Sequence, residues 1–446
     1  MNSLVFLPNT VEGIRATLLA HRPREAGAIL LAGHASISGA TRLLVREVIE
    51  APPNAYSVQD EFELALTPVF LAPLVKRARR EGWSLIFVHT HPFDGPVHFS
   101  PADDYGERLL MPSIFARTGD RPHGALVFGP CGFDARIWQS PKHSVSVEAI
   151  IEVGSDISIT SREANPKESL SVFERNVRAL GAEGQALVRT LTVGIVGLGG
   201  IGSIVAEQLA YLGVGRLILL DPDNIEATNL NRLVGASGKD IGRPKVDVVA
   251  KHVRRIRPEI DVKAINGSLL MARDAKALLS AHLVFGCTDT HGSRAILNQM
   301  AYQYLIPVID TGVTIDATGG PVSSVAGRIQ MLAPGLPCLV CHGLLRPDWV
   351  RRDLMTDEER ARDTYILGNN EPQPSVISLN GLVASLGVTM FLSAMTGFPS
   401  SARHQIYRGE HSLVRAVEAT RDPVCVVCSL RGALGRGDLW PLPWRQ

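Results

Sequence analysis

The chain has 446 residues, of which 45% are hydrophobic and 20% charged, and its formal net charge is +1. These values are typical of a globular protein of about two or three domains. The near-neutral charge gives no electrostatic reason to expect nucleic acid or a membrane surface as a partner. The opening residues, MNSLVFLPNTVEGIR, contain neither a basic leader nor a long apolar run, so we expect no signal peptide and a cytoplasmic location.

Residues 1–160 are predicted to form a mixed α/β domain. Short runs typical of strands alternate with turn residues. Between them, residues 67–82 have apolar residues at helical spacing and a basic last turn, which predicts a helix. The predicted strands cover residues 26–33, 83–88, 124–130 and 133–139.

A dense polar stretch, VHTHPFDGPVHFSPADD, follows the apolar run at 83–88. Alternate residues of a strand face the same way, so His89 and His91 at a strand end point at one spot and can bind a single Zn²⁺. Pro92 ends the strand, and a carboxylate at a helix start, Asp103 or Asp104, can complete the site. Such a set leaves one position for water, as catalytic zinc sites require.

A catalytic zinc site also needs a separate group that accepts the proton of the water. Glu25, just before the strand at 26–33, is the best upstream candidate. His98 has no partner by spacing and is expected in an exposed loop.

This arrangement resembles the JAB/JAMM (MPN-plus) metallopeptidase family, on Glu25, the run His89–Thr90–His91–Pro92, Ser100 and Asp103. The resemblance implies an α/β zinc isopeptidase that cuts after the C-terminal Gly of ubiquitin-like proteins. In that family's scheme, Glu25 is the general base, Ser100 supports the tetrahedral oxyanion, and His89, His91 and Asp103 hold the zinc.

Residues 161–171, SREANPKESLS, are polar and lack apolar periodicity, so we expect a linker between the first domain and a second one over 172–446. After it, strand-like and helix-like runs alternate, which predicts a doubly wound, Rossmann-like parallel sheet. The predicted helices cover 173–190, 202–213, 244–258 and 271–281, and the predicted strands 191–197, 215–221, 261–266 and 282–289.

The loop GIVGLGGIGS lies between the first of these strands and a helix. Its glycines permit a tight turn, and the helix N-terminus offers free N–H groups to phosphate. Asp221, at the end of the next strand, suits ribose hydroxyls. Such loops also bind nicotinamide dinucleotides. The glycines concerned are Gly197, Gly199, Gly200 and Gly202.

Charged residues after Asp221 favour a nucleoside triphosphate instead. DPDNIEATNLNRLV contains Asp223, Asn229 and Arg232, and IGRPKVDVV adds Lys245. An Arg and a Lys suit the phosphates of ATP, and they have no use at a nicotinamide. Asp289, at the carboxyl end of a later strand, can hold Mg²⁺ through water and phosphate oxygens.

The uncharged stretch 372–402 is long enough for a membrane span. Asn380 and several Ser, Thr and Gly residues dilute it, and no basic cluster flanks it, so we expect a buried helix of a large core.

Two Cys-x-x-Cys pairs, Cys338 with Cys341 and Cys425 with Cys428, lie in a chain for which we expect a reducing compartment. Four thiolates at this spacing favour tetrahedral structural zinc, and two vicinal redox pairs are the alternative.

The second half resembles the ThiF/MoeB/ubiquitin-activating superfamily over about residues 170–430, on the glycine loop, DPD…NLNR, GRPK and CTDTHGSR. The resemblance implies Mg-ATP-dependent adenylation of a Gly-Gly C-terminus. Asp221 would then bind ribose, Arg232 and Lys245 the phosphates, and Asp289 the magnesium. Arg175, in FERNVRALG, would be an arginine finger that reaches the ATP of the other subunit of a homodimer.

The sequence therefore predicts a fused JAB/JAMM peptidase and ThiF-like adenylyltransferase that acts on a ubiquitin-like or sulfur-carrier protein, with a conjugating enzyme as a further partner. The region 346–375, where many relatives hold a nucleophilic cysteine, has none, so we expect no enzyme thioester. Three alternatives stay open: a biosynthetic adenylyltransferase with a degenerate peptidase domain, a non-catalytic scaffold, and a nicotinamide-linked oxidoreductase.

Overall fold

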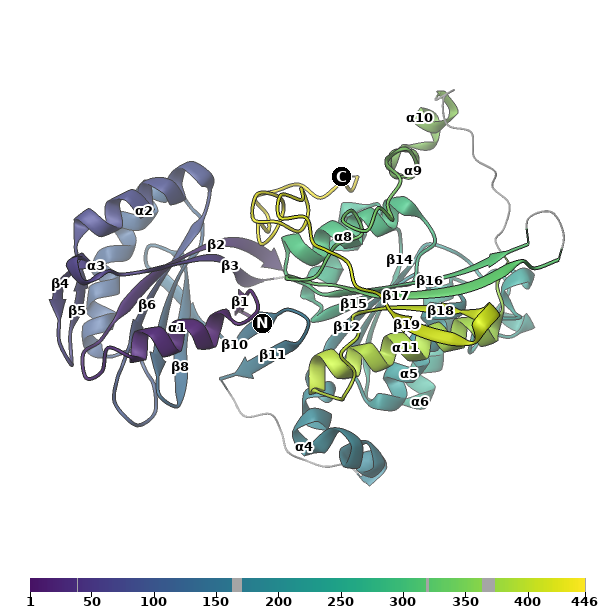
Figure 1. Cartoon of the computed structure of the whole chain (residues 1–446), viewed down its shortest axis with the longest axis horizontal. Coiled ribbons are helices and arrows are strands. Elements are labelled where there is room, and N and C mark those ends of the chain that lie inside the picture. Colours follow the sequence, from purple (N-terminus) through teal and green to yellow (C-terminus); the bar gives the residue numbers. More distant parts are fainter. Residues whose placement is uncertain (38, 163–170, 318–320, 363–373, 446) are drawn as a thin grey trace. The chain divides into compact units, whose positions relative to one another are not determined.

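The computed structural model describes residues 1–37, 39–162, 171–317, 321–362 and 374–445 (Figure 1). The chain forms two compact units, which are described separately. The N-terminal unit comprises residues 1–164 with 303–305 and 433–441, and the C-terminal unit comprises the remainder. Most of the predicted linker lies outside the described residues.

The N-terminal unit is built on a nine-stranded sheet with the order β11-β10-β1-β3-β2-β6-β7-β8-β9. The predicted strand runs at 26–33, 83–88, 124–130 and 133–139 are confirmed as β2, β6, β7 and β8. The strands are β1 (Ser3–Phe6), β2 (Gly27–Ile37), β3 (Ala40–Glu50), β6 (Ser84–Thr90), β7 (His123–Gly129), β8 (Gly132–Ser140), β9 (His143–Ser146), β10 (Ala149–Val153) and β11 (Ile157–Ser161), with β4 (Tyr56–Gln59) and β5 (Leu64–Leu66) forming a separate hairpin.

Helices cover both faces of this sheet. Helix α1 (Thr10–Leu19) contributes Ile14 and Leu18 to the core on one face. The other face packs against α2 (Pro68–Glu81), which confirms the predicted helix at 67–82, and against α3 (Pro101–Thr118). This burial of apolar side chains on both faces explains why the inner strands are almost continuously hydrophobic.

The C-terminal unit is built on an eight-stranded sheet with the order β14-β13-β12-β15-β16-β17-β18-β19. The four predicted strands, β12 to β15, pair in parallel, as predicted, and β16 extends this part. From β16 to β19, where no strand was predicted, the pairing is antiparallel, so the sheet is mixed and not parallel throughout. The strands are β12 (Thr192–Val196), β13 (Arg216–Asp221), β14 (Asp261–Asn266), β15 (Leu283–Gly286), β16 (Val308–Asp316), β17 (Ser324–Leu332), β18 (His404–Arg408) and β19 (Leu413–Ala416).

The predicted helices before β12, after β12 and after β13 are confirmed, the first with a break at Gly181. The predicted helix at 271–281 is wrong in type, because only one α-helical turn forms before a 3₁₀ helix, Lys276–Ser280. The helices are α4 (Glu174–Thr190), α5 (Gly200–Leu212), α6 (Lys245–Ile256), α7 (Ala272–Ala275), α8 (His291–Gln303), α9 (Pro347–Leu354), α10 (Asp357–Arg362) and α11 (Ile377–Thr396).

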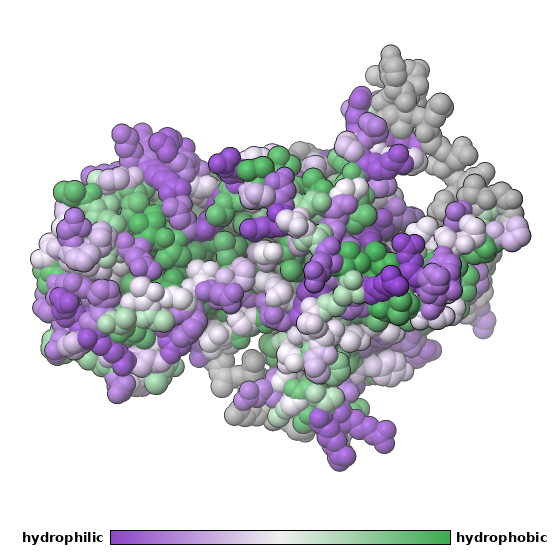
Figure 2. Space-filling view, in the orientation of Figure 1, coloured by the Kyte–Doolittle hydropathy of each residue, from purple (hydrophilic) through white to green (hydrophobic). Residues whose placement is uncertain are grey.

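Helix α11 contains the uncharged stretch. Among the described residues it alone is long and apolar enough to cross a membrane, and 56% of its most apolar window is buried within the protein. It packs against α5, β16 and β17, with Val383, Met390 and Phe391 fully buried. Hydrophilic and hydrophobic residues are interspersed on the face seen in Figure 2. The helix is therefore a core element of its unit.

Candidate functional site

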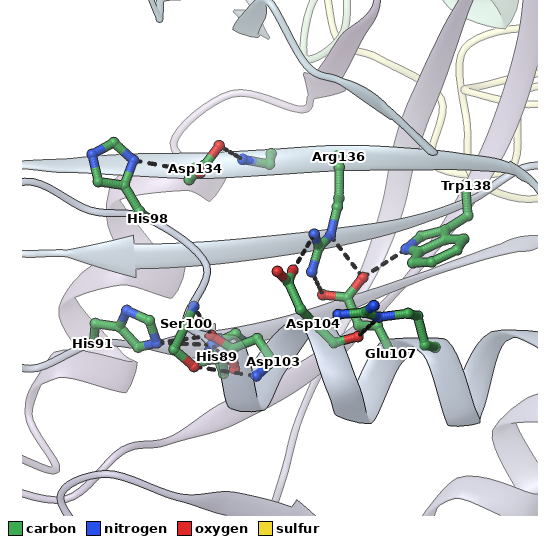
Figure 3. A network of polar contacts seen from close by, with 12 residues as sticks. His89, His91, His98, Ser100, Asp103, Asp104, Glu107, Asp134, Arg136 and Trp138 are labelled. Atoms are coloured by element: carbon green, nitrogen blue, oxygen red, sulfur yellow. Dashed lines mark hydrogen bonds and ion pairs between the residues drawn. The ribbon is translucent and has the colours of Figure 1, made fainter. Parts of the chain in front are cut away.

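A cluster of three potential metal ligands lies at the carboxyl end of β6. The Nε2 atoms of His89 and His91 are 3.3 Å apart. The carboxylate of Asp103 spans both rings, with Oδ1 3.1 Å from His89 Nε2 and Oδ2 3.2 Å from His91 Nε2 (Figure 3). All three side chains are partly buried.

These distances fit a zinc ion. In a tetrahedral site with Zn–N and Zn–O bond lengths of about 2.0–2.1 Å, neighbouring ligand atoms lie about 3.3 Å apart. Two imidazoles and one carboxylate are one of the three-ligand donor sets that leave a fourth position open in catalytic zinc sites. The three residues therefore have both the chemistry and the spacing for zinc.

The local sequence explains how the ligands converge. The backbone N–H of His91 donates to Phe128 O at 2.9 Å, which continues the pairing of β6 with β7 beyond Thr90. Between the histidines, Thr90 is buried and exchanges hydrogen bonds with Ala26. This alternation along the strand turns both imidazoles to the opposite face.

Asp103 is held by the start of α3. The Ser100 hydroxyl accepts from the Asp103 N–H at 3.1 Å, and Asp103 Oδ2 accepts from the Ser100 N–H at 2.6 Å, so the two form a capping box. Pro101 supplies the first helical position, where its missing N–H costs nothing. The helix cap thus fixes the third ligand.

Asp104, the competing candidate, faces elsewhere. Its Oδ1 accepts from Arg136 Nη1 at 2.6 Å, and it is absent from the three-residue cluster. His98 is 69% exposed, as expected for a loop residue, and its Nδ1 lies 3.7 Å from Asp134 Oδ2, a neighbour that sequence spacing does not indicate. Figure 3 shows Asp103 and Asp104 turned to different neighbours.

Glu25 lies beside this cluster because of strand register. In the antiparallel pairing of β2 with β6, Gly27 is opposite His89, so the residue two before Gly27 comes opposite His91. Glu25 Oε1 is 3.8 Å from His91 Nε2, and the Glu25 side chain is 5% exposed. Burial raises the pKa of Glu25 to about 7, against the attraction of both histidines.

The other carboxylate of the cluster shifts in the opposite direction. Burial alone would raise the pKa of Asp103, but hydrogen bonds with His89 and His91 hold it well below its usual range. The hydrogen bond with Asp103 raises the pKa of His91 despite burial. An ionised carboxylate and a protonatable one therefore lie side by side, which is typical of acid–base sites.

In the C-terminal unit, the glycine loop connects β12 to α5. A Cβ at Gly202 would lie 1.8 Å from Gly197 O, and one at Gly197 would lie 2.6 Å from Cys287 O. Gly197 also has a φ of +85°, which favours glycine. The loop is therefore tight against itself and against the end of β15, while Gly199 has open space around it and Gly200 begins α5.

Asp221, at the end of β13, holds this loop in place. It is buried, and its carboxylate accepts from the Leu198 N–H at 2.6 Å and from the Asp223 N–H at 2.8 Å. Burial raises its pKa. Asp223 is 62% exposed and pairs with Lys245 Nζ at 2.7 Å. The structure thus brings Asp221, Asp223 and Lys245 together beside the glycine loop.

Two further predicted residues lie close by. A Cβ at Gly200 would lie 3.4 Å from Arg232 Cδ, so this arginine borders the loop. Its guanidinium donates to the carbonyl of Thr228, and Asn229 accepts from the Glu226 N–H. Asn229 therefore shapes the turn that carries Arg232.

Asp289 is exposed and lies two residues beyond Cys287, whose carbonyl touches Gly197. The carboxyl ends of β12 and β15 are neighbours, so Asp289 lies at the same edge of the sheet as the glycine loop. Arg175 is exposed on the first turn of α4.

The four cysteines of the two Cys-x-x-Cys pairs meet. Sγ of Cys338 is 3.7 Å from that of Cys341 and 3.6 Å from that of Cys425, and Sγ of Cys341 is 3.5 Å from that of Cys428. Tetrahedral zinc with Zn–S bonds of about 2.3 Å places its sulfurs about 3.8 Å apart. The cluster fits structural zinc in both chemistry and spacing.

The two cysteines outside this cluster differ in environment. Cys131 is exposed on the turn between β7 and β8, whereas burial raises the pKa of Cys287 to about 12, which opposes thiolate formation.

Sequence reasoning missed two residues at these sites. Asn380 of α11 is buried against the glycine loop, since a Cβ at Gly200 would lie 2.1 Å from its Nδ2. Arg136 of β8 contacts the helix that carries Asp103. An amide side chain in the uncharged run 377–396, whose other polar residues are only Ser and Thr, was a signal for Asn380. For Arg136 the sequence contains a weaker signal, the alternation of charged and apolar residues in FDARIW.

Known proteins resemble the second half of the chain. The sequence profile of the ThiF family matches residues 173–427. The molybdopterin-synthase adenylyltransferase of Salmonella typhimurium is 30% identical over 257 residues, which are 56% of this chain and 92% of that protein. The SAMP-activating enzyme E1 of Haloferax volcanii is 28% identical over 162 residues, or 36% of this chain and 57% of that protein. The solved structure of E. coli MccB with ATP has a TM-score of 0.46 and 22% identity, and the alignment covers 58% of this chain and 75% of that chain.

The matched region runs from the start of α4 through the glycine loop to the second cysteine pair, and it is more than half of the 446 residues. It contains Asp221, Arg232, Lys245 and Asp289 in the arrangement described above. The chain therefore belongs to the ThiF family, and its C-terminal unit has the Rossmann-like α/β fold of that family.

Proposed function

We propose that the chain is a bifunctional enzyme whose C-terminal unit adenylates the C-terminus of a ubiquitin-like or sulfur-carrier protein and whose N-terminal unit is a zinc peptidase acting on the same class of protein. Family membership and the names of the similar adenylyltransferase and SAMP-activating enzyme support the first activity. The single observation that carries the second is the cluster of His89, His91 and Asp103 beside a buried Glu25.

For adenylation, the carrier's terminal carboxylate attacks the α-phosphate of ATP and pyrophosphate leaves. In this proposal Gly197, Gly199, Gly200 and Gly202 let the backbone approach the phosphates. Asp221 and Asp223 bind the ribose, Arg232 and Lys245 neutralise phosphate charge, and Asp289 holds Mg²⁺. Lys245 would exchange its present partner, Asp223, for phosphate oxygens.

For peptide cleavage, zinc held by His89, His91 and Asp103 would supply Lewis-acid activation of water. In this proposal Glu25 takes the proton of the water, because its buried carboxylate lies beside the cluster, 3.8 Å from His91 Nε2. The Ser100 hydroxyl accepts from Asp103 N–H and keeps its own proton to donate to the developing oxyanion.

Further parts of the proposal concern assembly and setting. We further propose a homodimer in which Arg175 reaches the partner's nucleotide, which the exposed position of Arg175 allows, together with a cytoplasmic location and a conjugating enzyme as a downstream partner. With no cysteine in residues 346–375, the adenylate would be the last species that this enzyme makes.

The adenylation proposal is tested by ATP–pyrophosphate exchange with a small carrier protein ending in Gly-Gly. Exchange should require both the carrier and Mg²⁺, and Asp289→Ala should abolish it. If wild type gives no exchange with any Gly-Gly carrier of its own genome, the proposed substrate class is wrong.

The peptidase proposal is tested with the same carrier extended by a short peptide after its Gly-Gly. Wild type should release the extension, whereas Glu25→Gln should release it at least 100-fold more slowly, the effect expected for loss of a general base. Equal rates for the two proteins would show that Glu25 is not the base.

A further inference from the structure

One face of β8 is turned toward the candidate metal cluster. Because alternate residues of a strand face the same way, Asp134, Arg136 and Trp138 lie on this face, whereas Ala135 and Ile137 belong to the hydrophobic core on the other. Figure 3 shows the three side chains along the strand above the loop and helix that carry Ser100 and Asp103.

Arg136 makes the largest set of contacts on this face. Its Nε and Nη2 donate to the two oxygens of Glu107 at 2.9 and 2.8 Å, and its Nη1 donates to Asp104 Oδ1 at 2.6 Å. The Arg136 and Glu107 side chains are 18% and 10% exposed, so the pair is largely screened from water. Trp138 Nε1 adds a hydrogen bond to Glu107 Oε2 at 2.6 Å.

Arg136 also holds the residue that precedes the helix. Its guanidinium lies 3.9 Å from the centre of the Phe99 ring. Phe99 immediately precedes Ser100, the cap of α3, and its ring lies 6.3 Å from that of His89. The Arg136 side chain therefore contacts residues on both sides of Asp103 in the sequence: Phe99 before it, and Asp104 and Glu107 after it.

From this geometry we infer that Arg136 is a positioning residue for the metal cluster, which keeps the first turn of α3 where Asp103 meets both imidazoles. The inference rests on the proposed zinc centre. Asp103 and Asp104 then have separate tasks, one toward the ion and the other toward Arg136. A planar, forked guanidinium suits this role, because it can bond two carboxylates and stack on a ring at once.

Loss of a group bonded directly to a metal ligand typically lowers metal affinity by about 10- to 100-fold, and we expect a similar loss when the turn that carries Asp103 is no longer held by Arg136. Arg136→Met keeps much of the side-chain length but removes every hydrogen bond and leaves the Glu107 carboxylate without its guanidinium partner. Arg136→Lys keeps the charge but cannot bond both carboxylates. Asp104→Asn removes one carboxylate charge and leaves Arg136 in place.

The test is zinc affinity of the full chain, measured by competition with a chromophoric chelator, together with thermal unfolding of the zinc-depleted protein. His89→Ala/His91→Ala defines the zinc that belongs to this cluster. Arg117→Met is the matched control, because Arg117 is an exposed arginine on the last turn of the same helix.

We expect Arg136→Met to weaken binding of that zinc by about 10- to 100-fold, with Arg136→Lys and Asp104→Asn between it and wild type and Arg117→Met at wild type. Wild-type affinity in Arg136→Met with only a lowered unfolding temperature would overturn the inference, since the arginine would then be merely structural. If Arg136→Met does not fold, the zinc affinities of Arg136→Lys and Asp104→Asn test the inference in its place: weakened binding supports it, and wild-type affinity in both overturns it. If wild type binds no more zinc than His89→Ala/His91→Ala, the zinc centre itself is wrong and the inference falls with it.

Discussion

At the scale of single residues, Glu25 shows the tension between stability and chemistry most directly. Its side chain is 5% exposed. Among the described residues, no cationic group lies closer to its carboxylate than His91 Nε2, at 3.8 Å. Burying an ionised carboxylate without a close partner is costly, so folding favours the protonated form. Such a group is more typical of a functional site than of a core designed for stability.

The first prediction follows from this pKa. Because the folded, zinc-depleted chain binds the Glu25 proton up to about pH 7 and the unfolded chain loses it near 4.5, the free energy of unfolding should fall as the pH rises between these values. Glu25→Gln cannot ionise, so it should be more stable than wild type at pH 8 by about 1–3 kcal/mol and similar at pH 4. Urea unfolding at both pH values measures the difference. If Glu25→Gln and wild type were equally stable at pH 8 as well as at pH 4, the burial argument would be contradicted.

At the scale of elements, short-range pattern predicted much of each site. His89 and His91 follow from strand alternation, whereas the helix start left Asp103 and Asp104 both open as the third ligand, and only the resemblance to the JAB/JAMM family favoured Asp103. Contacts between distant segments were beyond such reasoning: Arg136 lies 32 residues after Asp104, and its choice of partner depends on the pairing of β7 with β8.

The errors in the C-terminal unit have the same origin. Central strands are apolar runs in the sequence whether they pair with parallel or antiparallel neighbours. The change from parallel to antiparallel pairing at β16 therefore left no local sequence signal. The predicted helix at 271–281 forms as one α-helical turn followed directly by a 3₁₀ helix, and its first free N–H, that of Ala272, donates to Arg445 O at 2.7 Å, a partner far away in the sequence.

The second prediction concerns the glycine loop between β12 and α5. In Gly202→Ala the new methyl group would meet Gly197 O at 1.8 Å, so the loop must shift and Mg-ATP binding should weaken by at least 10-fold. Gly238→Ala is the control, since nothing lies within 4 Å of a Cβ there. Calorimetric titration with Mg-ATP measures both. Unchanged affinity in Gly202→Ala would show that the nucleotide binds elsewhere.

The third prediction concerns α4. If Arg175 acts on a partner's nucleotide, Arg175→Ala and Asp289→Ala chains should each be inactive alone, whereas a mixture should regain exchange activity, because one site of the mixed dimer contains both residues. Subunits are exchanged before ATP–pyrophosphate exchange is measured. A mixture that stays inactive would mean that Arg175 acts within its own chain or not at all.

At the scale of the whole molecule, the two candidate centres lie in different compact units, each with its own sheet and core. Separate cores allow separate activities, because a change at one site need not disturb the packing around the other. This arrangement suits an enzyme that processes a carrier's C-terminus and then activates it.

The fourth prediction uses that separation. Asp289→Ala should abolish ATP–pyrophosphate exchange and leave release of a peptide extension within about twofold of wild type, whereas Glu25→Gln should do the reverse. Both assays are run on the same preparations. Loss of both activities in Asp289→Ala would indicate misfolding or obligate coupling of the two units.

The most direct test of the claim that the chain fuses a zinc peptidase to an adenylyltransferase is a count of the zinc ions bound per chain. This measurement needs no knowledge of the substrate. Elemental analysis should find two in wild type, one in His89→Ala/His91→Ala, and two in the His98→Ala control from the same loop. One zinc in wild type, or two in His89→Ala/His91→Ala, would contradict the metal centre proposed for the N-terminal unit.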